Sequence, residues 1–356
     1  MLKEKIQLVL VSWMLYGGSI FLYTYVPFYE KFLQSEPHHF LIQKTLLCLL
    51  GLYTIFVLLF KKKFLLEKER SYITILGLKK LLQFLLRAMQ KELLLSSEEK
   101  VSLLLFLVKF YFIPIMSSFA LNNFLDVFHY GKLFPSDINQ NNLFSFYYPL
   151  VLSLIFLIDT TYFFVGYLIE SASFNNIVFS VESTTLGWLV TLACYPPFNN
   201  LTNDIFGWYP QNFSNFGNNS LNIFFGGIAL LLMSVYLWAT LSLGSKASNL
   251  TNRGIITTGA YQFVRHPAYA AKNITWWIMG IPFIFSPQIL LSSSDSTFIY
   301  FIMNDLPKTF VPILSLFAWS SIYYLRAVTE ERHLLKDPQY QLYMNKVPYR
   351  FIPKVF

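Results

Sequence analysis

The feature that most constrains this chain is a series of apolar segments, each about 20 residues long. A helix of that length crosses the hydrocarbon core of a bilayer, which is about 30 Å thick. The composition agrees, because 55% of the residues are hydrophobic and only 13% are charged. Soluble domains carry about a quarter charged residues. We therefore expect an all-α fold and a polytopic helical membrane protein.

Eight segments have the length and composition of a transmembrane span. They cover residues 6–27, 40–60, 101–121, 148–170, 176–197, 221–243, 268–291 and 308–326. The fifth is interrupted by polar residues and ends at Pro196-Pro197, which also allows a re-entrant or short helix. The first follows Lys3 and Lys5, as in a signal peptide, but its length and the lack of a small-residue cleavage site favour a retained span.

The distribution of Lys and Arg predicts the orientation of the chain. With the N-terminus inside and eight alternating spans, the inner segments hold 21 of the 27 basic residues and the outer segments hold 4. Lys and Arg concentrate in cytoplasmic loops, so we expect both termini on the cytosolic side. The net charge of +8 is then explained by membrane orientation, and nucleic acid is not an expected partner.

Residues 74–95 differ from the spans, because their apolar and basic side chains separate on opposite helical faces. The apolar face holds Leu78, Leu81, Leu82, Leu85, Met89 and Leu93, and the polar face holds Lys80, Gln83, Arg87 and Lys91. This pattern, next to Lys61-Lys62-Lys63, is typical of an interfacial helix on an anionic leaflet. A helix that packs between spans has the same pattern, so both alternatives stay open.

Few ionisable or thiol groups lie within the spans. Lys109 and Asp159 lie at similar depths in the third and fourth spans, and we predict that they form a structural pair, because isolated charges there are costly. The two cysteines, Cys48 and Cys194, lie in or beside apolar segments. They exclude a disulfide-stapled scaffold and offer no zinc spacing, so we expect no metal.

A first candidate for chemistry is the run Arg265-His266-Pro267-Ala268-Tyr269, between two spans. Proline suits the first turn of a helix, so the seventh span is expected to begin at Pro267. His266 then lies at a helix N-terminus, where free amides favour a carboxylate or phosphate. The alternative is an ordinary helix cap with Arg265 reaching the lipid headgroups.

A second candidate follows the last span. Glu330-Glu331-Arg332 places two adjacent carboxylates at a helix end, where cations or a cationic ligand must compensate them. The alternative is a solvated charge run. The aromatic tail that follows, through Tyr340 and Tyr343 to residues 346–353, is either a cap packed on the spans or a lid that carries Lys346 or Arg350 toward an anionic group.

In their order and spacing, these motifs resemble the isoprenylcysteine carboxyl methyltransferase and phospholipid methyltransferase families. The matching elements are GIITTGAYQFVRHPAY, the EER triplet and VPYRFIP. The resemblance covers residues 221–356, a membrane methyltransferase region with a cytosolic tail, and leaves residues 1–220 as a membrane region of unknown function.

The resemblance implies S-adenosylmethionine as the cofactor and a lipidic or prenylated methyl acceptor in the bilayer. It implies cofactor-binding roles for Gly259, Tyr261, His266, Pro267, Tyr269, Glu330 and Glu331, catalytic roles for Arg265 and Arg350, and substrate-binding roles for Lys346 and Arg350. A carboxylate acceptor is favoured, since it needs no base, whereas an amine would need one and only His266 is evident. Ala271 departs from the phospholipid-type pattern, which has glycine there.

Two other functions stay open. Sterol reductases that use NADPH share an RHP-x-Y run and a closing VPYR element with this chain. The EER triplet, however, has the methyltransferase form, and NADPH would require more cations near its phosphates. The third possibility is a transporter or scaffold with a degenerate site, which the intact motifs disfavour.

Overall fold

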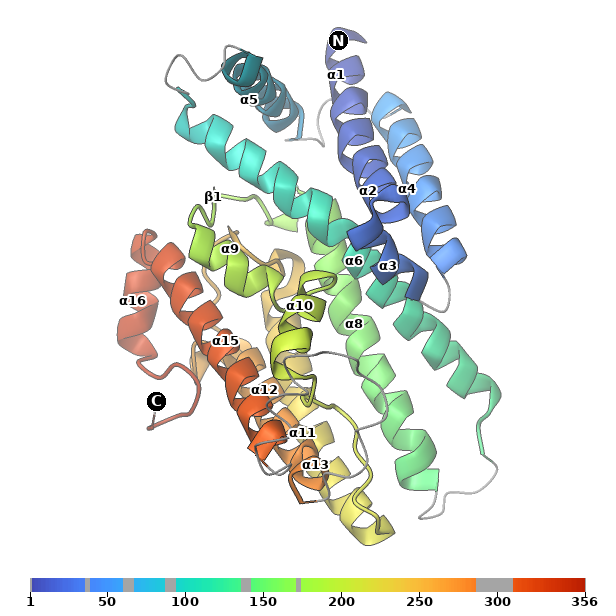
Figure 1. Cartoon of the computed structure of the whole chain (residues 1–356). Helices are drawn as coiled ribbons and strands as arrows, with labels where there is room; N and C mark the ends of the chain where they lie inside the picture. The colour runs from blue at the N-terminus through green and yellow to red at the C-terminus, as the bar shows by residue number, and fades with distance from the viewer. Residues whose placement is uncertain are drawn as a thin grey trace. The chain divides into compact units, whose positions relative to one another are not determined.

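The apolar segments form helices, and regular structure is almost entirely helical in the computed structural model (Figure 1). The structure describes residues 2–35, 39–59, 67–86, 94–135, 142–170, 174–285 and 310–355. Within them the only strands are β1 (Ser180–Val181) and β2 (Thr251–Asn252), which pair antiparallel. The expected all-α class is confirmed.

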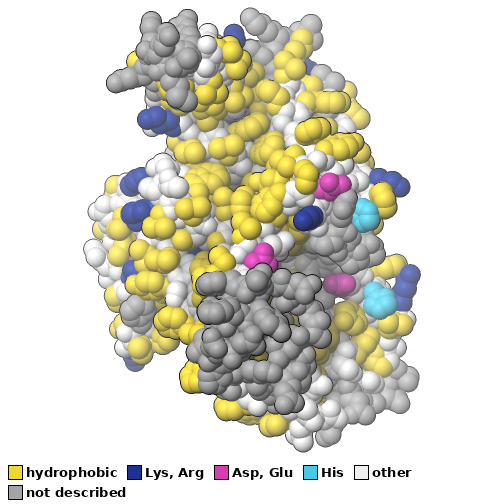
Figure 2. Space-filling view, viewed as in Figure 1, with side chains coloured by type: hydrophobic (Ala, Val, Ile, Leu, Met, Phe, Trp, Pro, Cys, Tyr) yellow, Lys and Arg dark blue, Asp and Glu magenta, His cyan; other side chains and the backbone are white. Residues whose placement is uncertain are grey.

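Four helices in the described part of the chain are long and apolar enough to cross a membrane. They are α6 (Ser97–Lys132), η3 with α8 (Leu143–Leu168), α11 with η5 (Asn219–Lys246) and α15 (Phe310–Leu334). Two shorter apolar helical stretches cover Val9–Tyr25 and His39–Ile55. Large hydrophobic side chains are exposed on these helices, including Leu231 (71%) and Phe317 (65%), and hydrophobic side chains cover much of the face in Figure 2. This exposure indicates a multi-pass integral membrane protein; its sidedness stays a prediction.

Two of the eight expected spans differ in the structure. The helix within the fifth, α9 (Thr185–Leu192), has eight residues and extends about 12 Å, so the short-helix alternative is correct there. The seventh begins at Pro267 as expected, but α12 (Pro267–Met279) is followed by a break at Gly280 and the short α13 (Ile281–Phe285). Residues 286–309, which hold the end of this span and the start of the next, lie outside the described residues.

The amphipathic segment forms α5 (Glu67–Leu86), which begins earlier than expected; residues 87–93 lie outside the described residues. Its Lys80 pairs with Glu99 of α6 at 2.7 Å. A Cβ added at Gly77 would meet a leucine of α6 at 2.9 Å, so the two helices are in close contact. These contacts favour a packing helix, and a position at the membrane surface stays a prediction.

The chain folds into two compact units, and the first comprises residues 1–121, 160–184 and 245–254. It contains α1 (Leu2–Ser12), η1 (Trp13–Gly17), α2 (Gly18–Tyr25), α3 (Pro27–Ser35), α4 (His39–Leu59), α5 and the β1–β2 ladder. The ring of Phe112 stacks on Tyr167 at 5.0 Å, and the Tyr167 hydroxyl accepts a hydrogen bond from the Asn249 amide. These contacts join α6 and α8 to the segment after α11 within this unit.

The second unit comprises residues 122–159, 185–244 and 255–356 and contains both candidate motifs. Its elements include α10 (Phe198–Phe206), α11 (Asn219–Leu243), η5 (Gly244–Lys246, of which only Gly244 lies in this unit), η6 (Gly259–Gln262), α12, α13, α15 and α16 (Pro338–Lys346). The side chain of Asn218 caps α11 by accepting from two backbone amides. Helix α12 packs against both α11 and α15. The division of function at residue 220 stays a prediction.

A buried aromatic cluster fixes α12 against α15 in this unit. Trp276, Leu316, Trp319 and Tyr323 are each at most 6% exposed and contact one another. Aromatic side chains of this size supply much of the packing energy between helices. The ends of α12 and α15 that carry the two motifs are therefore held in a fixed relation.

Candidate functional site

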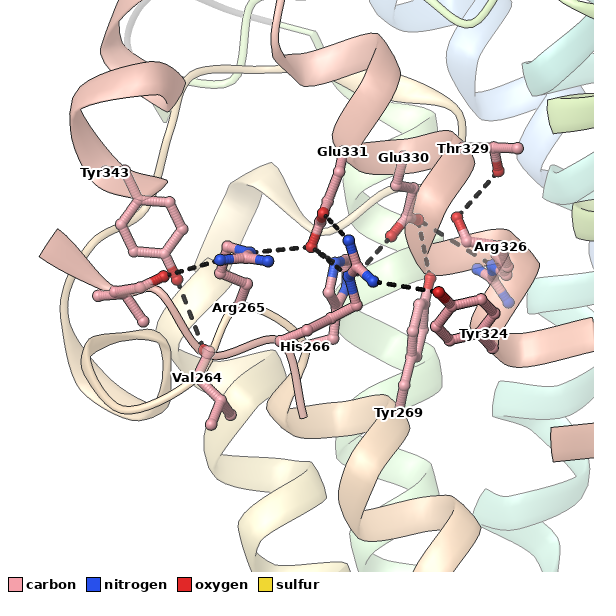
Figure 3. A network of polar contacts seen from close by, with 12 residues as sticks. Val264, Arg265, His266, Tyr269, Tyr324, Arg326, Thr329, Glu330, Glu331 and Tyr343 are labelled. Atoms are coloured by element: carbon pink, nitrogen blue, oxygen red, sulfur yellow. Dashed lines mark hydrogen bonds and ion pairs between the residues drawn. The ribbon is translucent and has the colours of Figure 1, made fainter. Parts of the chain in front are cut away.

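The structure brings the two sequence motifs together around one carboxylate, Glu331 (Figure 3). Its Oε1 accepts from Arg265 Nε at 2.9 Å and lies 3.0 Å from His266 Nε2. Arg350 donates Nε to Oε1 at 3.0 Å and Nη2 to Oε2 at 2.8 Å, a bidentate pair. The hydrogen bonds to Glu331 raise the pKa of Arg350. In the structure, protein cations compensate Glu331 of the acidic pair, which is one of the two alternatives expected from the sequence.

The end of the chain pairs with the segment that leads into α12. Arg265 Nη1 donates to the carbonyl oxygens of Val347 at 3.0 Å and Pro348 at 2.6 Å. The backbone amide of Arg265 donates to the Tyr349 carbonyl at 3.0 Å, and that of His266 donates to the Arg350 carbonyl at 2.9 Å. The tail is further held by Tyr340, Tyr343 and Val347, which form a buried cluster. The tail is therefore packed against the segment before α12 and against Glu331, and its role as a cap or as a lid stays a prediction.

Glu330 has a different environment from its neighbour. Its side chain is 27% exposed, against 5% for Glu331. Tyr269 donates its hydroxyl to Oε1 at 2.8 Å, and His266 Nδ1 lies 3.7 Å from Oε2. The imidazole of His266 stacks on the Tyr269 ring, with 5.3 Å between centroids and 12° between planes. Glu330 thus has acceptor capacity toward solvent beside two parallel aromatic rings.

Arg326 belongs to the same site, although the sequence analysis gave it no role. It is 3% exposed, and its guanidinium lies 5.0 Å from the ring centroid of Tyr269 and 5.5 Å from that of Tyr195. Its Nε is 4.0 Å from Glu330 Oε1. The spacing of four residues between Arg326 and Glu330 was the signal available in the sequence, since such pairs share a helical face.

Three of the expected cofactor residues have local structural roles. Gly259 has φ +64°, and a Cβ added there would lie 2.1 Å from Ser242 Oγ of α11, so glycine is required by the backbone and by the contact. The carbonyl of Tyr261 accepts from the Tyr343 hydroxyl at 2.6 Å. Pro267 is the first residue of α12, with His266 as its N-cap. These residues shape the loop that leads to the site.

Two other residues from the sequence analysis lie apart from this network. Lys346 ends α16 with an exposed side chain, and it makes no hydrogen bond or ion pair with the residues that the structure describes. Ala271, which stands where the phospholipid-type pattern has glycine, is 3% exposed. The methyl group of Ala271 is therefore buried against other parts of the protein.

The donor set of the site suits a small organic ligand with both charges. The amides of Ala268 and Tyr269 precede the first hydrogen bond of α12, which Ala270 donates to His266, and such amides favour a carboxylate. Glu330 favours a cation. Among the described residues, no three His, Cys, Asp or Glu side chains are arranged to hold a metal ion.

No family model matches this chain, and no curated protein or solved structure matches it significantly. The chemistry of its own site therefore carries the functional argument.

Proposed function

We propose that this protein is a membrane methyltransferase that uses S-adenosylmethionine and methylates a lipidic acceptor with a carboxylate. The observation that carries the proposal is Glu330, a partly exposed carboxylate beside the stacked rings of His266 and Tyr269. The motif resemblance over residues 221–356 supports the same assignment.

The residues present fit this cofactor. Its α-ammonium and sulfonium are cations that Glu330 complements, and its carboxylate suits the first amides of α12. The adenine suits the aromatic side chains near Glu331, where His266 lies 5.8 Å from Phe351 between ring centroids. When bound, S-adenosylmethionine would supply a methyl group on a positive sulfur, which keeps the electron pair of the broken bond as an acceptor oxygen takes the methyl.

In this proposal the cations around Glu331 act mainly as positioning residues. Arg265 uses its side chain on Glu331 and on the tail carbonyls, so its contribution is to hold His266 and the tail in place. Arg350 is 21% exposed and can also face an anionic group. A carboxylate acceptor is already ionised, so no residue of the chain has to remove a proton.

The test is calorimetric binding of S-adenosylmethionine to the protein in detergent, with Glu330→Gln as the variant. Loss of a charge-assisted hydrogen bond costs roughly 1.5–3 kcal/mol, so we expect affinity to fall by about 10- to 100-fold. Asp204→Asn is the matched control, because Asp204 is an exposed carboxylate of α10 in the same unit. Its affinity should equal that of the wild type.

Two results would overturn the proposal. Binding of NADPH in place of S-adenosylmethionine would make the protein a reductase-like enzyme. Binding of neither, by protein with an intact unfolding transition, would leave a transporter or scaffold.

A further inference from the structure

Outside the network around Glu331, the second unit contains a lysine, Lys272, about one helical turn beyond Tyr269 on α12. Lys272 is partly exposed, and its Nζ lies 5.4 Å from the ring centroid of Trp276 and 5.7 Å from that of Tyr236 on α11. The ammonium makes no hydrogen bond or ion pair with the described residues. An ammonium carries three donors, and in a membrane helix such a group normally finds an acceptor.

Asp159, the carboxylate that interacts electrostatically with Lys272, is already occupied by other donors. Asp159 of α8 is 5% exposed and accepts from the Tyr236 hydroxyl at 2.7 Å and from the Thr240 hydroxyl at 2.5 Å, one on each oxygen. Asp159 and Lys272 attract each other electrostatically without a contact within 4.0 Å. The predicted pairing of Asp159 with Lys109 stays a prediction. Lys272 is therefore left with donor capacity and with only a distant counter-charge.

Three groups interact electrostatically with Lys272: Asp159 of α8, Arg326 of α15 and Cys194. None of these three described residues makes a hydrogen bond or an ion pair with the ammonium. A bound carboxylate would give this ammonium the close acceptor that Asp159, engaged by two hydroxyls, does not provide.

We infer that Lys272 binds the carboxylate of a single-chain lipid, between α11 and α12. Lys272 is five residues beyond Pro267, roughly 7 Å along the helix axis at 1.5 Å per residue. A carboxylate at the end of one acyl or prenyl chain can reach that depth, whereas a phospholipid phosphate is held at the interface by its polar headgroup. Tyr236, which is partly exposed, offers an apolar ring to the chain. The role of this lipid as methyl acceptor rests on the proposed function, but its binding does not.

The test measures binding of radiolabelled oleate to the purified full-length protein, with oleyl alcohol and phosphatidylglycerol as competitors. Lys272→Met should weaken oleate binding at least 10-fold, and Lys272→Arg should retain it. Lys132→Met is the matched control, since Lys132 also lies over an aromatic ring, that of Phe128 at 4.3 Å. This control should bind oleate as the wild type does. S-adenosylmethionine affinity should be unchanged in all three variants.

A second variant keeps the inference testable if Lys272→Met folds poorly. Asp159→Asn removes the negative charge that opposes a bound carboxylate and should tighten oleate binding several-fold. The inference is overturned if Asp159→Asn leaves oleate affinity unchanged, if Lys272→Met binds oleate as the wild type does, or if oleyl alcohol or phosphatidylglycerol competes as well as unlabelled oleate. Failure of the wild type to bind S-adenosylmethionine while it binds oleate would overturn only the proposed function.

Discussion

Each compact unit contains a buried arginine beside a glutamate, and the two arrangements differ in how completely the polar atoms are paired. In the second unit Arg265 makes hydrogen bonds to Glu331 and to two carbonyl oxygens. In the first unit Arg253 is 3% exposed and donates Nη1 to the Asn176 carbonyl at 2.9 Å, while its Nε and Nη2 make no hydrogen bond with the described residues. Burial lowers the pKa of Arg253.

This difference distinguishes a structural contact between chain segments, at Glu170, from a candidate binding site, at Glu331. The first unit's glutamate, Glu170, pairs with Arg70 at 2.8 Å and accepts from the Val178 amide, so its contacts join chain segments beside the β1–β2 ladder. Around Glu331 the paired atoms also fix His266 and, through it, an aromatic stack beside the partly exposed Glu330. A hydrogen-bonded carboxylate such as Glu331 next to a partly exposed acceptor suits a binding site, because the bonded groups hold the acceptor's surroundings in place.

The largest effect is expected from Glu331→Gln. The substitution leaves Arg265 and Arg350 buried or half-buried without their counter-charge, and removal of one partner from such a pair costs about 3–5 kcal/mol. The thermal midpoint of the protein in detergent should therefore fall strongly. Glu330→Gln, at a carboxylate that is 27% exposed, should shift it little. Equal midpoints for the two variants would contradict the contrast between these carboxylates.

A matched pair of arginine substitutions tests the two units directly. Arg265→Met removes three hydrogen bonds and should cost about 2–4 kcal/mol. Arg253→Met removes one hydrogen bond and also two unpaired buried donors, so it should cost about 1 kcal/mol or less. Chemical unfolding of both variants in the same detergent gives the comparison. If Arg253→Met lost more unfolding free energy than Arg265→Met, the arginine of the first unit would contribute more to stability than that of the second.

Gly259→Ala tests whether this glycine serves the fold. The substitution combines a positive φ with a Cβ 2.1 Å from Ser242 Oγ, and a cost of about 2 kcal/mol is expected. Gly217→Ala is the control, because its φ is +73° but nothing lies within 4 Å of the added Cβ, so only about 1 kcal/mol should be lost. If Gly259→Ala keeps wild-type stability but loses S-adenosylmethionine affinity, the cofactor role given by the resemblance is the correct one.

The sequence predicted most of the membrane helices because a span is specified locally, by apolar length. Helix α11 (Asn219–Leu243) and the start of α12 at Pro267 lie within two residues of their expected positions. For the fifth segment a full crossing and a short helix both stayed open, because apolar content alone does not show that α9 is only eight residues long. Local signals predict a helix far better than they predict where tertiary contacts end it.

The site was predictable only in part, for a related reason. The motifs indicated that Arg265, His266 and the acidic pair act together, and the hydrogen bonds to Glu331 join them. The tail pairs with residues more than 80 positions earlier in the chain, through the Arg265 side chain and through backbone amides and carbonyls. The backbone groups leave no pattern in the sequence of side chains. Lys272 belongs to no motif either. Its lack of a close acceptor depends on the two hydroxyls that occupy Asp159, and the sequence did not predict these contacts.

The smallest effect is expected from Lys346→Ala, which separates the motif resemblance from the geometry. Lys346 is exposed and makes no contact with a described polar group, so stability should change by less than about 0.5 kcal/mol. S-adenosylmethionine and oleate affinities should also equal those of the wild type, because the anion site inferred here is at Lys272. A selective loss of oleate binding in Lys346→Ala, with Lys272→Met unaffected, would instead assign the acceptor's carboxylate to the tail. That result would support the lid interpretation of residues 346–353 and move the acceptor site from the helices to the chain end.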